Sequence, residues 1–340
     1  MSFAGLKKMD ETFLVLLFAI SFAVTLFSTP ILITSAIRKR IFGTDDNKAS
    51  KPQIPYLGGF TLFAGIASGI LLSVLYLAFL ENNIRETNLL LSALASITLL
   101  ALIGIFDDVF KLSWRTKILM PVIGAFPLVA ITAGDTAMSL PFLGVVDFGL
   151  FYTFVLIPLG VTGAANAINM AAGYNGLEAG SVAIISAFLL FIALQANSFP
   201  AAVILAVTLA ACLAFLKYNW FPAKIFPGDV GTLSLGAAIA SAVIIGNMEK
   251  YGVILLLPAF YELGATIYYW SKGVERRRAC HDPVIAKDGT LSPPAGAENY
   301  TLFYRILKRK PMRESALVKK VLTLYALCGF AALAVFYLQL

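Results

Sequence analysis

The sequence predicts an all-α integral membrane protein that forms a single polytopic domain over residues 1–340. Apolar residues make up 59% of the chain and charged residues only 13%, and the mean hydropathy is +0.84. This composition indicates that most of the chain has lipid rather than water as its solvent. Long apolar runs separated by polar loops, without regular alternation of apolar and polar residues, argue against a membrane β-barrel.

About ten apolar runs are long enough to be transmembrane helices. The first run, from Phe13 to Ile37, lacks a small-residue cleavage site and is too long for a signal-peptide core, so it is interpreted as a span. A long basic loop, residues 272–317, precedes the last run. The expected spans cover residues 12–37, 57–80, 88–106, 117–134, 149–167, 180–196, 199–217, 231–247, 251–271 and 318–338.

The distribution of charge predicts the orientation of these spans. If successive loops lie on alternate sides of the membrane, 22 of the 26 Lys and Arg residues fall on one side. The other side has only Lys7, Lys8, Arg85 and Lys250. The positive-inside rule places the basic side in the cytoplasm and both termini outside. The net charge of +7 is thereby explained without a nucleic-acid partner.

Three cysteines, Cys212, Cys280 and Cys328, are scattered through the chain without metal-type spacing. Two of them lie in apolar spans, which favours small core residues over a disulfide framework.

Two adjacent carboxylates, Asp107 and Asp108, stand where the third apolar run ends, and Trp114, Arg115 and Lys117 follow at once. The simplest interpretation is a pair of solvated carboxylates that caps the next helix. However, an acidic pair at a membrane boundary is costly without a metal, a cation or water beside it. Charges of both signs next to an aromatic ring favour a ligand that combines phosphate, metal and sugar.

Polar residues near two other spans predict further parts of this site. Asn166 and Asn169 are three residues apart, so a helix would place both amides on one face, where they either join helices or contact a ligand. Asp229 stands between two glycines at the start of a span, as a helix N-cap or as a ligand. Carboxylate and amide oxygens together suit Mg²⁺ or Mn²⁺ bound jointly with substrate phosphates.

The remaining candidates are weaker. The segment Gly173-Tyr-Asn-Gly176 interrupts the helical pattern and offers backbone groups to a ligand, while Glu178 is assigned a structural role. The lone His281 has no partner histidines and is not expected to bind a metal. Arg276, Arg277 and Arg278 are either a topology signal or a grip on phosphate.

The motifs occur in the order known from one family. They are Gly43-x-Asp-x-Asn-Lys48 with Ile54-Pro55, Asp107-Asp108-Val with Trp114-Arg115-x-Lys117, Asn166-Ala-Ile-Asn169 with Asn175-Gly-Leu-Glu-Ala-Gly180, and Gly228-Asp229. Together they resemble the polyprenyl-phosphate N-acetylhexosamine-1-phosphate transferases. The resemblance is strongest to the eukaryotic and archaeal UDP-GlcNAc:dolichyl-phosphate GlcNAc-1-phosphotransferases, and it implies ten transmembrane helices and a Mg²⁺-dependent cytoplasmic site.

The resemblance also implies roles for particular residues. Asp107, Asp108 and Lys117 form the catalytic set, and Asn169 and Asp229 become the metal ligands. The nucleotide-binding set is Thr44, Asp45, Asp46, Asn175 and Phe226. The set that contacts sugar or phosphate is Lys48, Trp114, Asn166, Arg276, Arg277, Arg278 and His281. The sequence departs from the family pattern at Lys111, at Tyr56 and in the last loop, where an Arg-His-Arg pattern has no unambiguous match.

The expected reaction is attack of dolichyl phosphate on the β-phosphorus of UDP-GlcNAc, which gives dolichyl-diphosphate-GlcNAc and releases UMP. This is the first step of lipid-linked glycan assembly. Asp107 and Asp108 are expected to organise metal, water and Lys117, with base catalysis as a minority option. The expected partners are UDP-GlcNAc, polyprenyl phosphate and membrane lipids, and a homodimer is an option. The membrane would be an archaeal plasma membrane or that of the endoplasmic reticulum.

Two alternatives remain at this point. One is a bacterial-type transferase that uses another UDP-sugar or undecaprenyl phosphate. The other is a lipid or nucleotide-sugar transporter, which would place its polar residues near the membrane midplane within inverted repeats.

Overall fold

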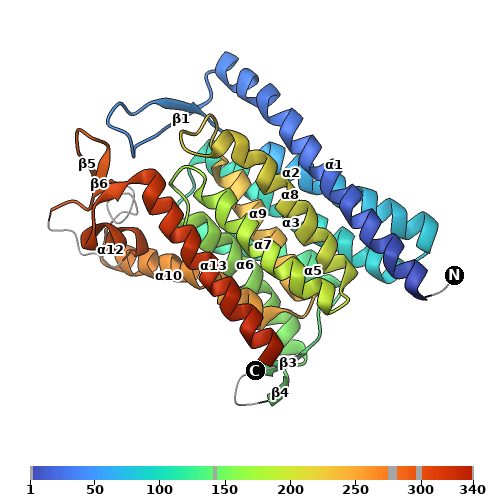
Figure 1. Cartoon of the computed structure of the whole chain (residues 1–340). Coiled ribbons are helices and arrows are strands. Elements are labelled where there is room, and N and C mark those ends of the chain that lie inside the picture. The colour runs from blue at the N-terminus through green and yellow to red at the C-terminus, as the bar shows by residue number, and fades with distance from the viewer. Residues whose placement is uncertain (1–2, 141–143, 275–281, 296–300, 339–340) are drawn as a thin grey trace.

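The computed structural model describes residues 3–140, 144–274, 282–295 and 301–338 as a bundle of long helices (Figure 1). In this described part, nine helices are long and apolar enough to cross a membrane. This confirms an integral membrane protein. The nine helical segments are α1 (Phe3–Arg38), α2 (Gly59–Tyr76) with the π-turn η1 (Leu77–Glu81), α3 (Ile84–Phe110), α6 (Ile157–Met170) after the π-turn η3 (Tyr152–Leu156), α7 (Leu177–Gln195), α8 (Phe199–Asn219), α9 (Gly228–Ile245), α10 (Glu249–Ser271) and α13 (Glu314–Leu338).

The tenth expected span, residues 117–134, is helical but interrupted. It consists of α4 (Trp114–Leu119), the 3₁₀ turn η2 (Met120–Ala125) and α5 (Phe126–Ala130). Pro121 and Pro127 lie at the starts of the second and third pieces, where proline removes a backbone donor and breaks a continuous helix. The hydroxyl of Ser96 donates to the carbonyl of Gly124 (2.5 Å), which satisfies one acceptor at the interruption.

This interrupted segment nevertheless runs the length of α9. Near its start, Lys117 Nζ lies 3.5 Å from Asp229 Oδ2 at the first turn of α9. Just after its end, the backbone N–H of Asp135 donates to Asn247 Oδ1 (2.5 Å), two residues beyond α9. The segment therefore extends as far as a membrane-spanning helix, although it is not one regular helix.

Helix α9 is the centre of the bundle, packed against α3, α6, α8 and α2. Every residue of α9 except Asp229 is buried. Its many Gly, Ala and Ser residues allow neighbouring backbones to approach closely, as is usual where helices pack in lipid. At Gly104 of α3, an added Cβ would lie 2.5 Å from backbone atoms of Asp229 and Val230. This close approach brings the end of α3, with its acidic pair, beside the start of α9.

The structure also contains short β-strands, which the all-α prediction did not include. β1 (Phe42–Thr44) pairs with β2 (Gln53–Pro55), and β3 (Ala137–Leu140) pairs with β4 (Gly144–Asp147). In the basic loop, β5 (Val284–Ile285), β6 (Thr290–Ser292) and β7 (Met312–Arg313) form a three-stranded sheet beside α12 (Leu302–Arg309). Strands of two to four residues are too short for sequence alternation to reveal them.

The loops predicted to share one side meet at one end of the bundle. Backbone bonds join Gly58 and Gly59 to the carbonyls of Phe226 and Pro227 (2.8 and 2.7 Å), and Asn47 Nδ2 donates to the carbonyl of Gly173 (2.7 Å). Figure 1 shows β1, β5 and β6 at this end, whereas α1 begins and α13 ends at the other end. The loops that the sequence assigns to one side therefore gather at one end of the bundle.

Candidate active site

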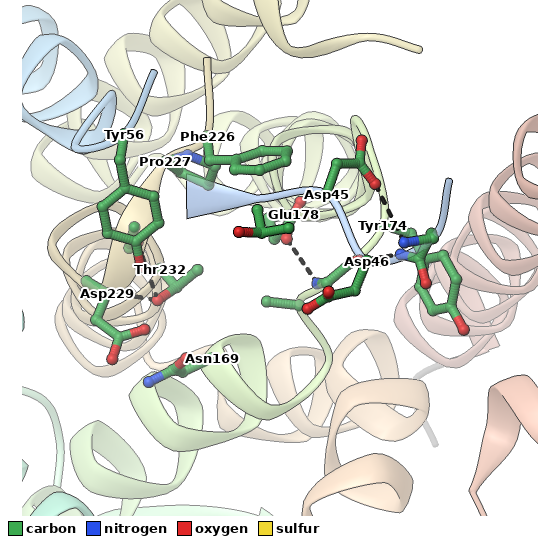
Figure 2. Close-up of a pocket in the computed structure, with 15 residues that line it drawn as sticks. Asp45, Asp46, Tyr56, Asn169, Tyr174, Glu178, Phe226, Pro227, Asp229 and Thr232 are labelled. Carbon is green, nitrogen blue, oxygen red and sulfur yellow. Dashed lines mark hydrogen bonds between the residues drawn. The ribbon is translucent and has the colours of Figure 1, made fainter. Parts of the chain in front are cut away.

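A cavity of about 250 Å³ lies at the end of the bundle where these loops meet (Figure 2). Its lining comes from the β1–β2 loop, the end of α6 with the following loop, and the start of α9. Six residues expected at the site from the sequence line it: Thr44, Asp45, Asp46, Asn169, Phe226 and Asp229. The other lining residues are Asn47, Tyr56, Ala172, Gly173, Tyr174, Glu178, Pro227, Gly228 and Thr232.

Asp108 binds the first turn of α9. Its Oδ1 accepts from the backbone N–H of Asp229 (3.0 Å) and its Oδ2 accepts from that of Val230 (3.2 Å). The first N–H groups of a helix have no partner within the helix, so a carboxylate there is favourable both as acceptor and as charge. Gly228 has φ +69, and a Cβ at this position would lie 2.7 Å from Asp108 Oδ2. The glycine thus leaves room for Asp108 to cap α9 from a neighbouring helix.

Tyr56 completes the environment of Asp108. Its hydroxyl donates to Asp108 Oδ1 (2.9 Å), and its ring lines the cavity. Burial of the phenol raises the pKa of Tyr56 well above its ordinary value, and the nearby carboxylates of Asp229 and Asp108 raise this pKa further. Tyr56 is therefore a neutral hydrogen-bond donor at any physiological pH.

Asp107 holds Lys117 against Asp229. Asp107 is buried, its Oδ1 accepts from the N–H of Leu112 (3.0 Å), and its Oδ2 lies 2.6 Å from Lys117 Nζ. Lys111 ends α3 with φ +51, and the Ser113 side chain caps α4, so the chain turns back and brings Lys117 to the pair. One ammonium group therefore lies between two carboxylates.

Asn169 and Asp229 face the cavity from α6 and α9 (Figure 2). Asn166, one helical turn earlier, does not line it. The Nδ2 of Asn166 donates instead to the carbonyls of Ile118 (3.2 Å) and Thr162 (3.0 Å). Of the two interpretations left open for the amide pair, helix joining describes Asn166. Asn169 lines the cavity, and its contact with a ligand stays a prediction.

Asn175 and Lys48 lie behind the lining rather than in it. Asn175 is buried, and its Nδ2 donates to Asp45 Oδ2 (3.1 Å) and Glu314 Oε1 (2.8 Å). Lys48 contacts the carboxylate of Asp45 and lies 3.2 Å from Glu314 Oε2. In this arrangement both residues support the β1–β2 loop that contains Asp45. Direct contact of Asn175 with uracil, or of Lys48 with sugar or phosphate, stays a prediction.

Some expected site residues are not described. Arg276, Arg277, Arg278 and His281 lie outside the described residues. Trp114 begins α4, but its side chain is outside the described part of the structure.

The structure also shows contacts of Tyr56, Glu178 and Glu314 that sequence reasoning did not predict. Tyr56 carried only a weak signal as a departure from the family pattern. Glu178 lines the cavity and accepts from the N–H of Gly173 (2.8 Å), which fits its expected structural role. Glu314 gave no signal, because an acidic residue at the start of a helix is common and its partners lie far away in sequence.

Known proteins resemble this chain over most of its length. It is 34% identical over 257 residues to a Saccharolobus solfataricus protein provisionally named UDP-N-acetylglucosamine–dolichyl-phosphate N-acetylglucosaminephosphotransferase, covering 75% of this chain and 78% of that protein. A Schizosaccharomyces pombe protein with this enzyme name is 28% identical, covering 73% of this chain and 65% of that protein. A Bacillus subtilis protein provisionally named undecaprenyl-phosphate N-acetylglucosaminyl 1-phosphate transferase is 30% identical, covering 81% and 75%. The family model described as glycosyl transferase family 4 matches residues 90–247.

Proposed function

The chain belongs to glycosyl transferase family 4, and from this membership we propose that it transfers GlcNAc-1-phosphate from UDP-GlcNAc to a polyprenyl phosphate. The acceptor we propose is of the dolichyl kind, and the products are UMP and polyprenyl-diphosphate-GlcNAc. The observation that carries the proposal is that Asn169 and Asp229 line one cavity, with the Asp107–Lys117 pair held against Asp229. This set offers acidic, amide and cationic groups to a diphosphate.

The nucleophile in this proposal is an oxygen of the lipid phosphate. A bond forms between that oxygen and the β-phosphorus, and the bond from the β-phosphorus to the bridging oxygen breaks, so that UMP leaves. A phosphomonoester has a second pKa of about 6, so the attacking dianion already dominates at neutral pH. The reaction therefore requires relief of repulsion between two anions rather than a strong general base.

The chain's own residues act by binding and orientation. Asp108 accepts two backbone N–H bonds and one from Tyr56, which leaves it a positioning role at the start of α9. Asp107 holds Lys117, whose ammonium group would stabilise negative charge on the transferred phosphoryl group. Phe226 and the loop of Thr44 and Asp45 would border the nucleotide, with Asn175 holding that loop from behind.

Mg²⁺, with Mn²⁺ as a substitute, fits the donor chemistry of the cavity. Asn169 and Asp229 would hold the ion, because both line the cavity and carry side-chain oxygen atoms, and Asp229 is the one residue of α9 that is not buried. Within the described ranges, no group of three or more His, Cys, Asp or Glu side chains is arranged to hold a metal by itself, so substrate phosphates would complete the shell. When bound, such an ion neutralises charge on the diphosphate and on the leaving UMP.

Ten crossings with the site in the cytoplasm are the topology that we propose. The interrupted segment α4–η2–α5 would be the fourth crossing, since it extends along α9. The basic residues gathered on the loops of the site's end support a cytoplasmic location, and both termini would then lie outside.

The function is tested by assaying UMP release from UDP-GlcNAc by the purified protein in nanodiscs. We expect release that requires a prenyl phosphate, with dolichyl phosphate preferred over undecaprenyl phosphate. A clear preference for undecaprenyl phosphate would favour the bacterial-type activity, which the Bacillus subtilis relative makes the second candidate. Uptake of UDP-GlcNAc or lipid by sealed vesicles without UMP release would indicate a transporter.

A further inference from the structure

Glu314, the first residue of α13, lies in the middle of a buried hydrogen-bond network. Only 3% of the residue is exposed. Its Oε1 accepts from both the backbone N–H (2.7 Å) and the Nδ2 (2.8 Å) of Asn175. Its Oε2 faces Lys48 Nζ at 3.2 Å. The carboxylate thus uses both oxygen atoms on two residues that lie 139 and 266 positions away in sequence.

Asn175 joins this carboxylate to the wall of the cavity. Its Nδ2 also donates to Asp45 Oδ2 (3.1 Å), and its Oδ1 accepts from the backbone N–H of Ala223 (2.7 Å) and from Lys48 (3.3 Å). Three loops therefore meet at a single amide side chain. These are the loops that contribute Asp45, Tyr174 and Phe226 to the cavity lining.

The charges in this network make Glu314 costly to alter. Lys48 is shared by two buried carboxylates, those of Asp45 and Glu314. Removing the charge of Glu314 leaves the donors of Asn175 with a poorer acceptor and Lys48 with one anionic partner fewer. Since α13 supplies no residue to the cavity lining, such a change acts on the cavity only through Asn175 and Lys48.

We propose that Glu314 is a positioning residue for nucleotide binding: through Asn175 and Lys48 it fixes the three loops in the arrangement that accepts the uridine nucleotide. The inference rests on the proposed function, because it takes that nucleotide as the ligand. The catalytic pair Asp107 and Lys117 contacts Asp229 rather than this network. Loss of Glu314 therefore weakens nucleotide affinity and leaves the transfer step largely unchanged.

The test compares Glu314→Gln with Glu249→Gln in the full chain in nanodiscs. Glu249 is a matched control, since it is also the first residue of a long helix and also accepts a hydrogen bond, from Tyr152, but lies at the opposite end of the bundle. We expect Glu314→Gln to raise the KM for UDP-GlcNAc and the Kd for UMP about tenfold, while kcat stays within about threefold of wild type. Glu249→Gln is expected to leave KM and Kd unchanged, even if its Tm falls.

A double variant tests whether Glu314 acts through Asn175. We expect the double variant Asn175→Ala with Glu314→Gln to bind UMP no more weakly than Asn175→Ala alone. Adding the control substitution Glu249→Gln to either single variant should leave the Kd for UMP unchanged. If Glu314→Gln does not fold, Glu314→Asp withdraws the carboxylate by one methylene group and should give a smaller rise in the Kd. Unchanged UMP affinity in a folded Glu314 variant, or a fall in kcat alone, would overturn the inference. Wild-type protein that binds no UMP would instead overturn the proposed function.

Discussion

Asp108 and Asp107 are neighbours in sequence, but their carboxylates contact different partners. Asp108 accepts three hydrogen bonds, from two backbone N–H groups of α9 and from Tyr56. Asp107 contacts Leu112 and Lys117. Neither carboxylate is among the residues that line the cavity. At the scale of single residues, the acidic pair is therefore better placed to hold α9 and Lys117 than to take a proton from a substrate.

The pH dependence of turnover tests this assignment. We expect the rate to fall on the acid side as the dianion of the lipid phosphate takes up a proton, at about pH 6. This acid limb should remain, at reduced height, in Asp107→Asn and Asp108→Asn. Because its pKa is raised in the folded protein, Tyr56 stays neutral below its ordinary pKa of about 10, so it should produce no alkaline limb between pH 7 and about 10. Loss of the acid limb in one Asn variant would assign that aspartate the role of base.

Asp229 is the residue on which the metal proposal depends. Chelation with EDTA should abolish turnover, and Mg²⁺ or Mn²⁺ should restore it. Asp229→Asn should lower turnover by on the order of a hundredfold or more, while the protein still inserts and purifies. Binding of Mn²⁺ to protein and UMP, followed by electron paramagnetic resonance, gives a readout independent of activity. Full turnover of the chelated protein would contradict the proposal.

At the scale of helices, the site depends on how closely α3 approaches α9. Gly104 lets the end of α3 lie against Asp229 and Val230, and Gly59 of α2 contacts Gly231 in the same way. These glycines hold the first turn of α9 between two helices, where Asp108 can reach it. The sequence indicated that the acidic pair and Asp229 share one face of the membrane, but it carried no signal for this contact between α3 and α9.

Gly104→Ala tests the contact. The added Cβ would lie 2.5 Å from the backbone of α9, so the helices must separate, and we expect a loss of about 1–3 kcal/mol in the free energy of unfolding together with reduced turnover. Gly264→Ala in α10 is the control, because no atom outside its own stretch of helix lies within 4 Å of the added Cβ. It should be neutral or stabilise by up to about 1 kcal/mol. Equal thermal shifts for the two variants would mean that the close approach is unimportant.

At the scale of the whole molecule, hydropathy was sufficient to predict nine of the expected spans as helices, because a long apolar run has few alternatives to a membrane helix. The tenth differs, since Pro121 and Pro127 divide it into short pieces. Six of the expected site residues line one cavity. This grouping could be predicted, because the motifs that contain these residues fall in loops assigned to one side of the membrane. Glu314 and the supporting positions of Asn175 and Lys48 could not be derived in this way, since they depend on contacts between distant segments.

The proposed topology can be tested by labelling single cysteines. In a background without Cys212, Cys280 and Cys328, the exposed positions Asp147 in β4 and Lys287 beside β5 would each be changed to cysteine. In intact cells, a membrane-impermeant maleimide should label Asp147→Cys at once and Lys287→Cys only after permeabilisation. The reverse pattern would place the site outside. Labelling of both positions from one side would contradict the odd number of crossings, five, that the proposed topology places between them.

The most direct test of the central claim is the fate of the β-phosphorus. Purified protein would be given UDP-GlcNAc carrying radioactive phosphorus in the β position, together with dolichyl phosphate and Mg²⁺, and Asp229→Asn would serve as the inactive control. Transfer of GlcNAc-1-phosphate predicts that the label moves into the lipid product while the released UMP is unlabelled. Label that remains in water-soluble UDP while GlcNAc appears on the lipid would show transfer of the sugar alone and would contradict the account.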